Sequence, residues 1–576
     1  MHKIFRIQEL VDLIVQNLAV REVTEDPYDA TYRLHPLPPE VVKDVRALGR
    51  VGRVFRESCL NALWYCQTGI AELLFMISAI ASPPPLFSPD GVIVWTSISR
   101  WTLLRPLQPE DVPTILFYGS RIREMHLADR WKTDYVQLGW SSVDFPLPLG
   151  TVLFPQLRVL VWADTESSWT GWNLDFVLDG AGNKLSEMRG SISSHSRPKF
   201  MATLERQSPH LSHLSLKCYD WQENAREAII RFARTILPSA RNLRELHLLN
   251  NFQKYLNIWN VIPLLPLLRK LSLYWSCWEM SGDLDPAIPR IPISFRTLTS
   301  FTIATCGTRS LCHVLDKLTL PNLCEFHVDV TEDYAEDHRS VSIIRTILQS
   351  VLSTCADSPL RSLIVDGSID AEHLLESPDT AQDVLGIDDL RPFMGKYPKL
   401  EVFDLRVLYP WKLGDDAVRE IVRVWGPRMR LFRLDPAGGW SPTSCITFEG
   451  LEHIASNCPH LTTLGVNFAG TLPQAHVPMQ SNCGTASRPS PRQNETVQHL
   501  YVGRSPIERS VVTDMARYLR SLFPNLRKII PDDFIRTRSD WVSEEGALLR
   551  ADGTQGSWNA LAQKWEMAED ILNTVD

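Results

Sequence analysis

The sequence predicts an α/β solenoid, and three features of the chain support this fold class. The first is a short apolar cassette, Leu-x-x-Leu-x-Leu, which returns along most of the 576 residues. The second is an amphipathic helical pattern that precedes many of these cassettes. The third is length, because a chain of this size exceeds one compact core, whereas a repeat array grows by adding units. Together these features indicate leucine-rich repeats.

Thirteen cassettes can be placed on the sequence. Four match the pattern closely and begin at Leu211, Leu243, Leu268 and Leu461. Nine looser copies begin at Ile122, Leu157, Leu298, Leu323, Leu360, Leu400, Met429, Val497 and Leu526. A single apolar run would fit any buried strand, but recurrence at this spacing predicts one short strand in each repeat.

Helical patterns alternate with the cassettes. Apolar residues at three- and four-residue spacing fill the ranges 229–237, 341–351 and 418–425, each just before a cassette. We therefore expect helix–strand repeats, with the strands forming a parallel sheet on the concave side and the helices forming the convex back. A stretch rich in Gly and Ser, 179–197, falls in the longest interval between cassettes and can hide a degenerate repeat.

Residues 1–65 have a different pattern, with three short helical stripes and no cassette. The stripes consist of Ile7, Leu10, Val11, Ile14 and Leu18, then Val45, Leu48, Val51 and Phe55, then Leu60, Leu63 and Trp64. A polar insertion with several prolines, about 21–40, separates the first two stripes and is expected to be a mobile loop. Three helices this short bury little by themselves, so this unit is expected to pack against something else.

The expected domain order follows from these patterns. Residues 1–65 form the helical domain, 66–110 a helical linker or cap, 111–535 the solenoid, and 536–576 a helical cap. A polar stretch, about 470–494, is expected to be a disordered insertion in a late repeat. The apolar stripe between Trp558 and Leu572 predicts the terminal helix that covers the last repeat.

Composition excludes several function classes. The formal net charge of −8 and the lack of a basic run argue against nucleic acid or an acidic membrane as partner. The 11 cysteines include no Cys-x-x-Cys pair and suit reduced, buried thiols, and Cys458 in particular is expected to be a small buried thiol. No secretory signal or membrane-spanning run is evident, so a cytoplasmic or nuclear location is expected.

No catalytic site is expected. Searches for dinucleotide, phosphate-binding, nucleophile-elbow and zinc-protease motifs give no match, so we expect no catalytic residue, no metal and no cofactor. A solenoid instead exposes a long face suited to binding a protein. The candidate contact residues on the concave face lie between or just after the cassette leucines, and we expect about a third of them to matter for binding. They are Lys217, His247, Tyr274, Trp275, His327, Asp329, Arg406, Arg433, Asp435 and Tyr501.

Two parts of the sequence resemble a known combination. The segments 7–18, 45–55 and 60–64 resemble an F-box in the form found in mushroom-type fungi, with Gln8 where Pro is usual and Gly52 where Cys is usual. The segment 446–464, with its Cys458-Pro459-His460-Leu461, is similar to the cysteine-containing type of leucine-rich repeat that often accompanies F-boxes.

This resemblance implies the substrate-recognition subunit of an SCF-type cullin-RING ubiquitin ligase. The F-box would bind a Skp-family adaptor, and through it the cullin and RING subunits, while the repeats would hold a target protein for ubiquitin-dependent degradation. The adaptor-binding residues implied are Ile7, Leu10, Val11, Ile14, Leu18, Leu48, Val51, Phe55, Leu63 and Trp64. The alternative is a leucine-rich-repeat scaffold or inhibitor with no ubiquitin role, whose first helices only cover the first repeat.

Overall fold

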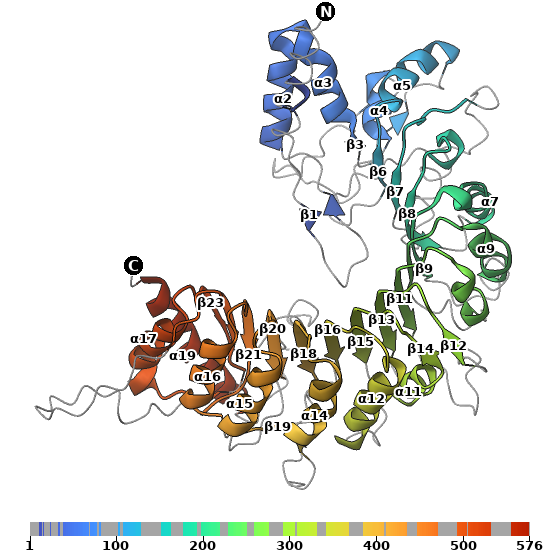
Figure 1. Cartoon of the computed structure of the whole chain (residues 1–576). Helices are drawn as coiled ribbons and strands as arrows, with labels where there is room; N and C mark the ends of the chain where they lie inside the picture. The colour runs from blue at the N-terminus through green and yellow to red at the C-terminus, as the bar shows by residue number, and fades with distance from the viewer. Residues whose placement is uncertain are drawn as a thin grey trace, which may run out of the picture. The chain divides into compact units, whose positions relative to one another are not determined.

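A computed structural model of the chain describes residues 11–13, 15, 23–24, 33–34, 39–67, 70–77, 80–81, 102–103, 108–127, 151–162, 177–192, 197–218, 229–249, 258–275, 292–305, 308–330, 341–367, 384–407, 411–434, 446–469, 492–503, 505–531 and 554–574. The chain divides into two compact units, Met1–Tyr274 and Trp275–Asp576. Each unit contains parallel strands accompanied by helices (Figure 1). The predicted α/β solenoid of leucine-rich repeats is confirmed.

The first unit builds its sheet from strands that pair in chain order. The strands are β3 (Cys66–Gln67), β6 (Glu124–His126), β7 (Val159–Trp162), β8 (Glu187–Ile192), β9 (His213–Cys218), β10 (Glu245–Leu249) and β11 (Lys270–Trp275). Every pairing in this series is parallel. Two short antiparallel pairs accompany them, β1 (Val23–Thr24) with β2 (Arg33–Leu34) and β4 (Ile80–Ala81) with β5 (Thr102–Leu103).

The second unit continues the same pattern. Its strands are β13 (Ser300–Thr305), β15 (Glu325–Val330), β16 (Ser362–Asp366), β18 (Val402–Arg406), β20 (Leu431–Leu434), β21 (Thr463–Gly465), β22 (His499–Tyr501) and β23 (Lys528–Ile530). These also pair in parallel and in chain order. Short parallel pairs join β12 (Ile293–Ser294) to β14 (Leu318–Thr319) and β17 (Leu385–Gly386) to β19 (Trp411–Lys412).

Helices connect the strands. In the first unit they are α2 (Pro39–Val51), α3 (Arg53–Trp64), α4 (Ala71–Met76), α5 (Val112–Gly119), α7 (Arg197–Gln207) and α9 (Leu237–Ser239), with one-turn pieces η1 (Pro109–Asp111), η3 (Ser208–His210), η4 (Phe232–Ile236), η5 (Ile258–Asn260) and η6 (Ile262–Leu264). In the second unit they are α11 (Thr308–Leu315), α12 (Val341–Thr354), α14 (Ile387–Lys396), α15 (Asp415–Val424), α16 (Phe448–Asn457), η8 (Arg509–Val511), α17 (Val512–Leu522) and α19 (Thr554–Thr574). The predicted helices at 341–351 and 418–425 correspond to α12 and α15.

The cassette leucines form ladders because neighbouring strands pair in register. Leu246 of β10 lies opposite Leu214 of β9 and Leu271 of β11, and each of these side chains is at most 1% exposed. The looser cassettes of the second unit fill the same position with rings, such as Phe301 and Phe326, which stack at a centroid distance of 5.6 Å. Fully burying one such side chain contributes about 1.5–3 kcal/mol, so the ladders supply much of the cohesion between repeats.

Among the residues that the structure describes, the sheet contains two strands that the thirteen cassettes do not mark. One is β8, in the stretch where a degenerate repeat was suspected; Gly190 stands where the cassette has its last leucine. A Cβ atom on Gly190 would lie 2.1 Å from the ring of Trp162 on β7, so that tryptophan fills the space that a leucine would occupy. The other is β3, which the register places opposite β6 with the polar Gln67 beside Met125.

The structure differs from the expected organisation between residues 66 and 110. This range is predicted to be a helical linker or cap, and it does contain α4, but β3 at its start already belongs to the sheet. The Gln67 side chain, 9% exposed, donates a hydrogen bond from Nε2 to the carbonyl of Leu63 at 2.9 Å. A polar residue satisfied in this way can occupy a core position without an apolar signature in the sequence. The expected insertions lie almost wholly outside the described residues.

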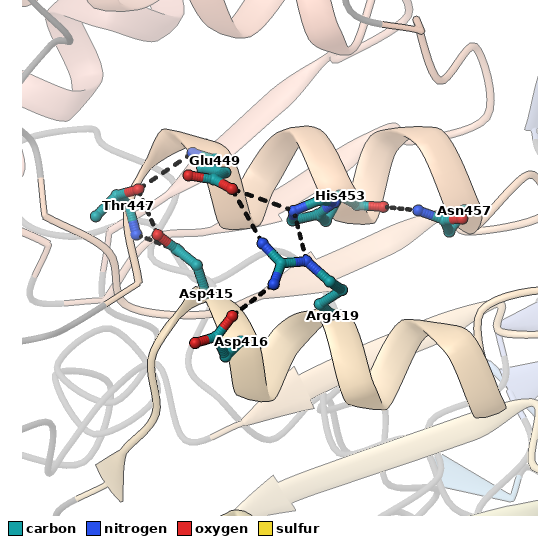
Figure 2. A network of polar contacts seen from close by, with 7 residues as sticks. All are labelled: Asp415, Asp416, Arg419, Thr447, Glu449, His453 and Asn457. Carbon is teal, nitrogen blue, oxygen red and sulfur yellow. Dashed lines mark hydrogen bonds and ion pairs between the residues drawn. The ribbon is translucent and has the colours of Figure 1, made fainter.

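Asp415 at the start of α15 anchors the first turn of α16 on the helical side of the second unit (Figure 2). Its carboxylate accepts hydrogen bonds from the Thr447 backbone N at 2.8 Å and from Thr447 Oγ1 at 2.7 Å. Thr447 in turn caps α16, because its Oγ1 accepts from the backbone N of Glu449 at 3.2 Å. A Cβ atom on Gly450 would lie 2.5 Å from Asp415 Oδ1, so the contact requires glycine there.

Arg419 extends this network along the exposed side of the two helices (Figure 2). Its guanidinium contacts Asp416 at 2.5 Å and Glu449 at 3.0 Å, and its Nε lies 3.1 Å from Nε2 of His453. The Arg419 and Glu449 side chains are about half exposed, and exposed ion pairs contribute about 0–1 kcal/mol each. The ion pairs of Arg419 therefore link α15 to α16 and add little to stability.

The amphipathic helix expected near the C-terminus is α19, and it packs on the last repeat. Trp565 and Ala568 are fully buried, and Trp565 Nε1 donates to the carbonyl of Ser505 at 3.0 Å. Glu569 Oε2 accepts a hydrogen bond from the backbone N of Ile529 on β23 at 2.8 Å. This contact occupies a backbone donor at the end of the sheet, where an unpaired strand edge would invite association. Within the part of the chain that the structure describes, no helix is both long and apolar enough to span a bilayer.

Candidate protein-binding surfaces

The face of the strands opposite the cassette leucines, here called the open face, carries a cluster of charged side chains in the second unit. The register places two rows of residues across β15, β16, β18 and β20. The first row is His327, Ile364, Asp404 and Arg433, and the second is Asp329, Asp366 and Arg406. Adjacent strands lie about 4.8 Å apart, so charged residues in one row are within contact distance.

Asp404 is the centre of this cluster. Its side chain is 2% exposed, and Arg433 binds it with two parallel contacts, Nε to Oδ1 at 2.8 Å and Nη2 to Oδ2 at 2.5 Å. Arg406 Nε lies 3.4 Å from Oδ2 of the same carboxylate. A charge buried this deeply is costly unless it is paired and hydrogen-bonded, and here two guanidinium groups pair with it.

The Arg433 side chain crosses the neighbouring strand β21 because that strand presents glycine. A Cβ atom on Gly465 would lie 2.6 Å from Cγ and 3.0 Å from Cδ of Arg433. With that space open, the guanidinium carbon lies 4.6 Å from the centroid of the Tyr501 ring on β22. Such a cation–π contact contributes about 0.5–2 kcal/mol, depending on its exposure. The cluster therefore extends beyond β20 to Tyr501 on β22.

The second row has an acidic end. Arg406 Nη1 contacts Asp366 Oδ2 at 2.9 Å, and Asp329 lies opposite Asp366 on the next strand. Burial, together with the negative charge of Asp366, raises the pKa of Asp329 to about 7, although Arg406 opposes the shift. Burial and the nearby Arg406 lower the pKa of His327, so this imidazole is neutral at physiological pH. The open face thus offers fixed Arg donors beside a carboxyl group that titrates near neutrality.

The open face of the first unit has a smaller polar group centred on Glu245. His213 Nε2 lies 3.5 Å and Lys270 Nζ 3.4 Å from Glu245 Oε1. The hydrogen bond with His213, aided by the charge of Lys270, lowers the pKa of Glu245 to about 2 despite the burial that opposes the shift. Burial lowers the pKa of His247 to about 4, so that ring stays neutral. The carboxylate of Glu245 can accept hydrogen bonds and the amine of Lys270 can donate them at this partly buried surface.

Five of the ten concave-face candidates come together in the second unit. They are His327, Asp329, Arg406, Arg433 and Tyr501. In the first unit, Lys217, His247 and Tyr274 are half buried on strands β9, β10 and β11. Trp275 ends β11, and Asp435 lies outside the described residues.

Sequence reasoning missed Asp366, Asp404 and Gly465, which occupy cassette positions on the open face. Asp404 and Gly465 directly follow the second leucine-position residue of their cassettes, and Asp366 comes two residues further along its own. Their position within the cassette would have identified them. Taking every residue at the fifth and seventh cassette positions includes all three, whatever their residue type.

The first helices form a small separate core. Val11, Val15, Val45 and Cys59 are at most 3% exposed and pack together, with Leu48, Phe55 and Leu63 against them. A hydrogen bond from Ser58 Oγ to Asp12 links α3 to the first helical residues. Of the three predicted stripes, the first is described only at residues 11–13 and 15, which are helical. The second is divided, because Val45, Leu48 and Val51 lie on α2 whereas Phe55 lies on α3 together with the third stripe. Helix α3 is fixed to the repeats by Arg121, which contacts Glu57 at 2.8 Å.

The structure divides the predicted adaptor-binding residues between the interior and the surface. Val11 and Trp64 are buried, with Trp64 packed on Tyr118 at 4.6 Å between ring centroids, so these side chains support the helices instead of forming their surface. Leu48, Phe55 and Leu63 pack on the small core, while Val51 is 75% exposed. Ile7, Leu10, Ile14 and Leu18 lie outside the described residues. Leu13 and Val54, 56% and 48% exposed, add further apolar surface that the prediction did not name.

Cys458 lies inside its repeat, as expected. It is 2% exposed, and burial raises the pKa of its thiol to about 12, so the thiol stays protonated. Its carbonyl accepts a hydrogen bond from Asn494 Nδ2 at 2.6 Å. Within the described ranges, one group with metal-binding side chains occurs, in the first unit, where Cys66, Glu124 and His126 lie close together.

Comparison with models of known protein families gives no match for this chain, and no curated protein matches it. Among solved structures, the chain is similar to one described as the crystal structure of the Rad7 and Elc1 complex in yeast. The match covers 66% of this chain and 84% of that chain, with 11% sequence identity and a TM-score of 0.31.

Proposed function

We propose that this chain is the substrate-recognition subunit of an SCF-type cullin-RING ubiquitin ligase, acting without catalytic residues of its own in the cytoplasm or nucleus. The observation that carries the proposal is the exposed apolar surface of the first helices. The described residues of these helices share a small core and leave Leu13, Val51 and Val54 exposed. Together with the resemblance of these segments to an F-box, this surface fits the binding of a Skp-family adaptor.

The repeats supply the second half of the proposal. The open face of the second unit holds Arg406, Arg433 and Tyr501 in a shared network, with Asp404 fixing both guanidinium groups. Arg and Tyr are enriched among residues that dominate protein interfaces, and fixing their side chains in advance lowers the entropic cost of binding. We assign target binding to this cluster and to the polar group around Glu245.

The mechanism requires only that two binding events occur on one chain. Adaptor binding through the helices would bring the cullin and RING subunits, and target binding by the repeats would place target lysines beside a charged ubiquitin-conjugating enzyme. Tethering raises the effective concentration of the reacting groups, which accelerates transfer without any chemistry by the receptor.

The test of this proposal uses surface substitutions that spare the fold. Val51→Asp and Val54→Asp place charges on exposed positions, so the helical unit should remain folded. Each charge would be desolvated in an apolar interface, and we expect affinity for the Skp-family adaptor of the host to fall at least about 30-fold. Leu264→Asp is the matched control, because Leu264 is also apolar and 70% exposed but lies in η6, outside the helical unit.

Adaptor binding by the full-length chain should be measured by pull-down and titration. Binding that Val51→Asp and Val54→Asp weaken, and that Leu264→Asp preserves, supports the receptor function. A folded wild-type chain that does not bind the adaptor would refute it. The alternative, a leucine-rich-repeat scaffold or inhibitor, would then describe the chain.

A further inference from the structure

Three side chains with metal-binding atoms gather at the beginning of the sheet in the first unit. Cys66 lies on β3, and Glu124 and His126 lie on β6. The Sγ atom, one carboxylate oxygen and one ring nitrogen all lie within 4.8 Å of one another. We propose that these residues form a binding site for a divalent transition-metal ion such as zinc.

The strand register explains why the three side chains share one face. Cys66 lies directly opposite Glu124 in the parallel pair of β3 and β6. His126 is two residues beyond Glu124, and residues two apart on a strand point to the same side. Met125, between them, is fully buried among the cassette residues, so Glu124 and His126 lie on the other face. The arrangement is therefore fixed by backbone pairing and does not depend on a flexible loop.

The donor spacing suits a tetrahedral metal site. Zinc binds sulfur at about 2.3 Å and imidazole nitrogen or carboxylate oxygen at about 2.0–2.2 Å, which puts ligand atoms about 3.3–3.7 Å apart. The three ligand atoms would need to move only about 1 Å closer together. Rotation about the side-chain torsions allows this while the strands stay in place. Thiolate and imidazole ligands favour zinc, copper or nickel over magnesium or calcium, which prefer oxygen ligands.

Charge and burial support the same assignment. The three residues are between 5% and 8% exposed, and the neighbouring strand β7 places Val159 opposite Glu124 and Val161 opposite His126. One thiolate, one carboxylate and one neutral imidazole carry a charge of −2, which a divalent cation balances. A neutral site avoids most of the cost of burying separate charges beside apolar side chains.

The site would join the first helices to the sheet. Cys66 follows the end of α3 by two residues, and the Tyr65 carbonyl between them accepts hydrogen bonds from the backbone N atoms of Arg123 and Glu124 at 2.9 and 3.0 Å. A metal held by β3 and β6 would strengthen this junction. With three protein ligands, a fourth coordination position remains for water or for a side chain of another molecule.

The test is metal binding by the full-length chain, with zinc and cobalt(II) as probes. Equilibrium dialysis at buffered free zinc should give one bound ion per chain. At 100 times the dissociation constant, zinc should raise the melting temperature by about 2 °C if the chain unfolds as one unit, and by about 5 °C if the first unit unfolds alone. Cys66→Ser and His126→Gln should each weaken binding at least about 100-fold. Cys324→Ser is the matched control, because it removes a partly exposed thiol from the second unit.

Cobalt(II) provides a second readout on the unaltered chain. Coordination by Cys66 should produce the intense absorption of a thiolate–cobalt charge transfer, which carboxylate or imidazole ligands alone do not give. This spectrum keeps the proposal testable even if Cys66→Ser fails to fold. Absence of the charge-transfer band in the wild-type chain, or zinc binding unchanged by both Cys66→Ser and His126→Gln, would overturn the proposal.

Discussion

Replacing Gly465 by alanine tests how the charged cluster of the second unit is assembled. The added Cβ atom would lie 2.6 Å from Arg433 Cγ, well inside contact distance. The Arg433 side chain must then move, and it gives up its position over Tyr501 together with its two hydrogen bonds to Asp404. Because Gly465 matters only through Arg433, its substitution should have almost no cost once Arg433 is absent.

The magnitude follows from the interactions that the displaced Arg433 no longer makes. The cation–π contact contributes about 0.5–2 kcal/mol and the charge-assisted hydrogen bonds about 1.5–3 kcal/mol. Alanine is favoured over glycine within a strand by about 0.5–1 kcal/mol, which offsets part of this cost. We therefore expect Gly465→Ala to reduce the free energy of unfolding by about 2–3 kcal/mol. In an Arg433→Ala background the same change should be neutral or stabilise by about 0.5 kcal/mol.

The assay is a double-mutant cycle measured by urea unfolding of the full-length chain. The four proteins are the wild type, Gly465→Ala, Arg433→Ala and the double variant. We predict a coupling energy of about 2–3.5 kcal/mol, far above the roughly 0.5 kcal/mol expected for independent sites. Equal costs of Gly465→Ala in the two backgrounds would refute the reasoning, because Gly465 would then act without Arg433.

Three further predictions follow from individual contacts. Gly450→Ala should lower the free energy of unfolding by about 1–2 kcal/mol, because the added Cβ would clash with Asp415 Oδ1 and break the contacts of Asp415 with Thr447. The control is Gly395→Ala on α14, whose Cβ would meet no atom within 4 Å and which should be neutral or stabilising. Equal melting temperatures for the two variants would contradict this prediction. Asp329 has a folded pKa of about 7, above its ordinary 3.8, so its stabilisation is complete below about pH 4 and is lost as pH rises through 7. Relative to wild type, Asp329→Asn should therefore show a weaker fall in melting temperature between pH 5 and 8, and identical pH profiles would count against the shifted carboxyl. Cys458 has a buried thiol with a pKa of about 12, so it should resist alkylation at neutral pH in the folded chain, while the partly exposed Cys324 reacts. If mass spectrometry finds Cys458 labelled as fast as Cys324, Cys458 is not buried.

The strands were largely predictable because apolar ladders leave a direct trace in the sequence. Every one of the thirteen cassettes corresponds to a strand, since residues that face the core of a repeat have few alternatives to leucine-like side chains. The two unmarked strands show where this logic fails. In β8 a tryptophan from the neighbouring strand replaces the missing leucine over Gly190, and in β3 the polar Gln67 is satisfied by a backbone carbonyl. Both replacements depend on residues that are neighbours in space, so the sequence pattern of the strand itself does not show them.

The candidate sites were less predictable, for a related reason. Arg406, Arg433 and Tyr501 were expected on the concave face, but the sequence could not show that one carboxylate, Asp404, pairs with both arginines. That pairing arises from the register between repeats separated by about thirty residues. The same limit applies to Cys66, Glu124 and His126, whose spacing along the chain resembles no known metal motif. Backbone pairing between β3 and β6 brings them together.

The division of the first helices also required the structure. Periodicity placed Leu48 and Val51 on one stripe of a helix, but only packing shows that Leu48 faces the small core while Val51 is 75% exposed. This distinction matters for experiments. A charge at a buried position unfolds the helical unit, whereas a charge at Val51 tests the surface itself.

The measurement that tests the central claim most directly is reconstitution of the full assembly. The full-length chain should be mixed with a Skp-family adaptor and a cullin–RING pair from the same host and then separated by size-exclusion chromatography. The receptor function predicts one co-eluting complex with equal amounts of each subunit, which the double variant Val51→Asp/Val54→Asp does not enter. Separate elution of a folded chain, under conditions in which an established F-box protein joins the same subunits, would contradict the account.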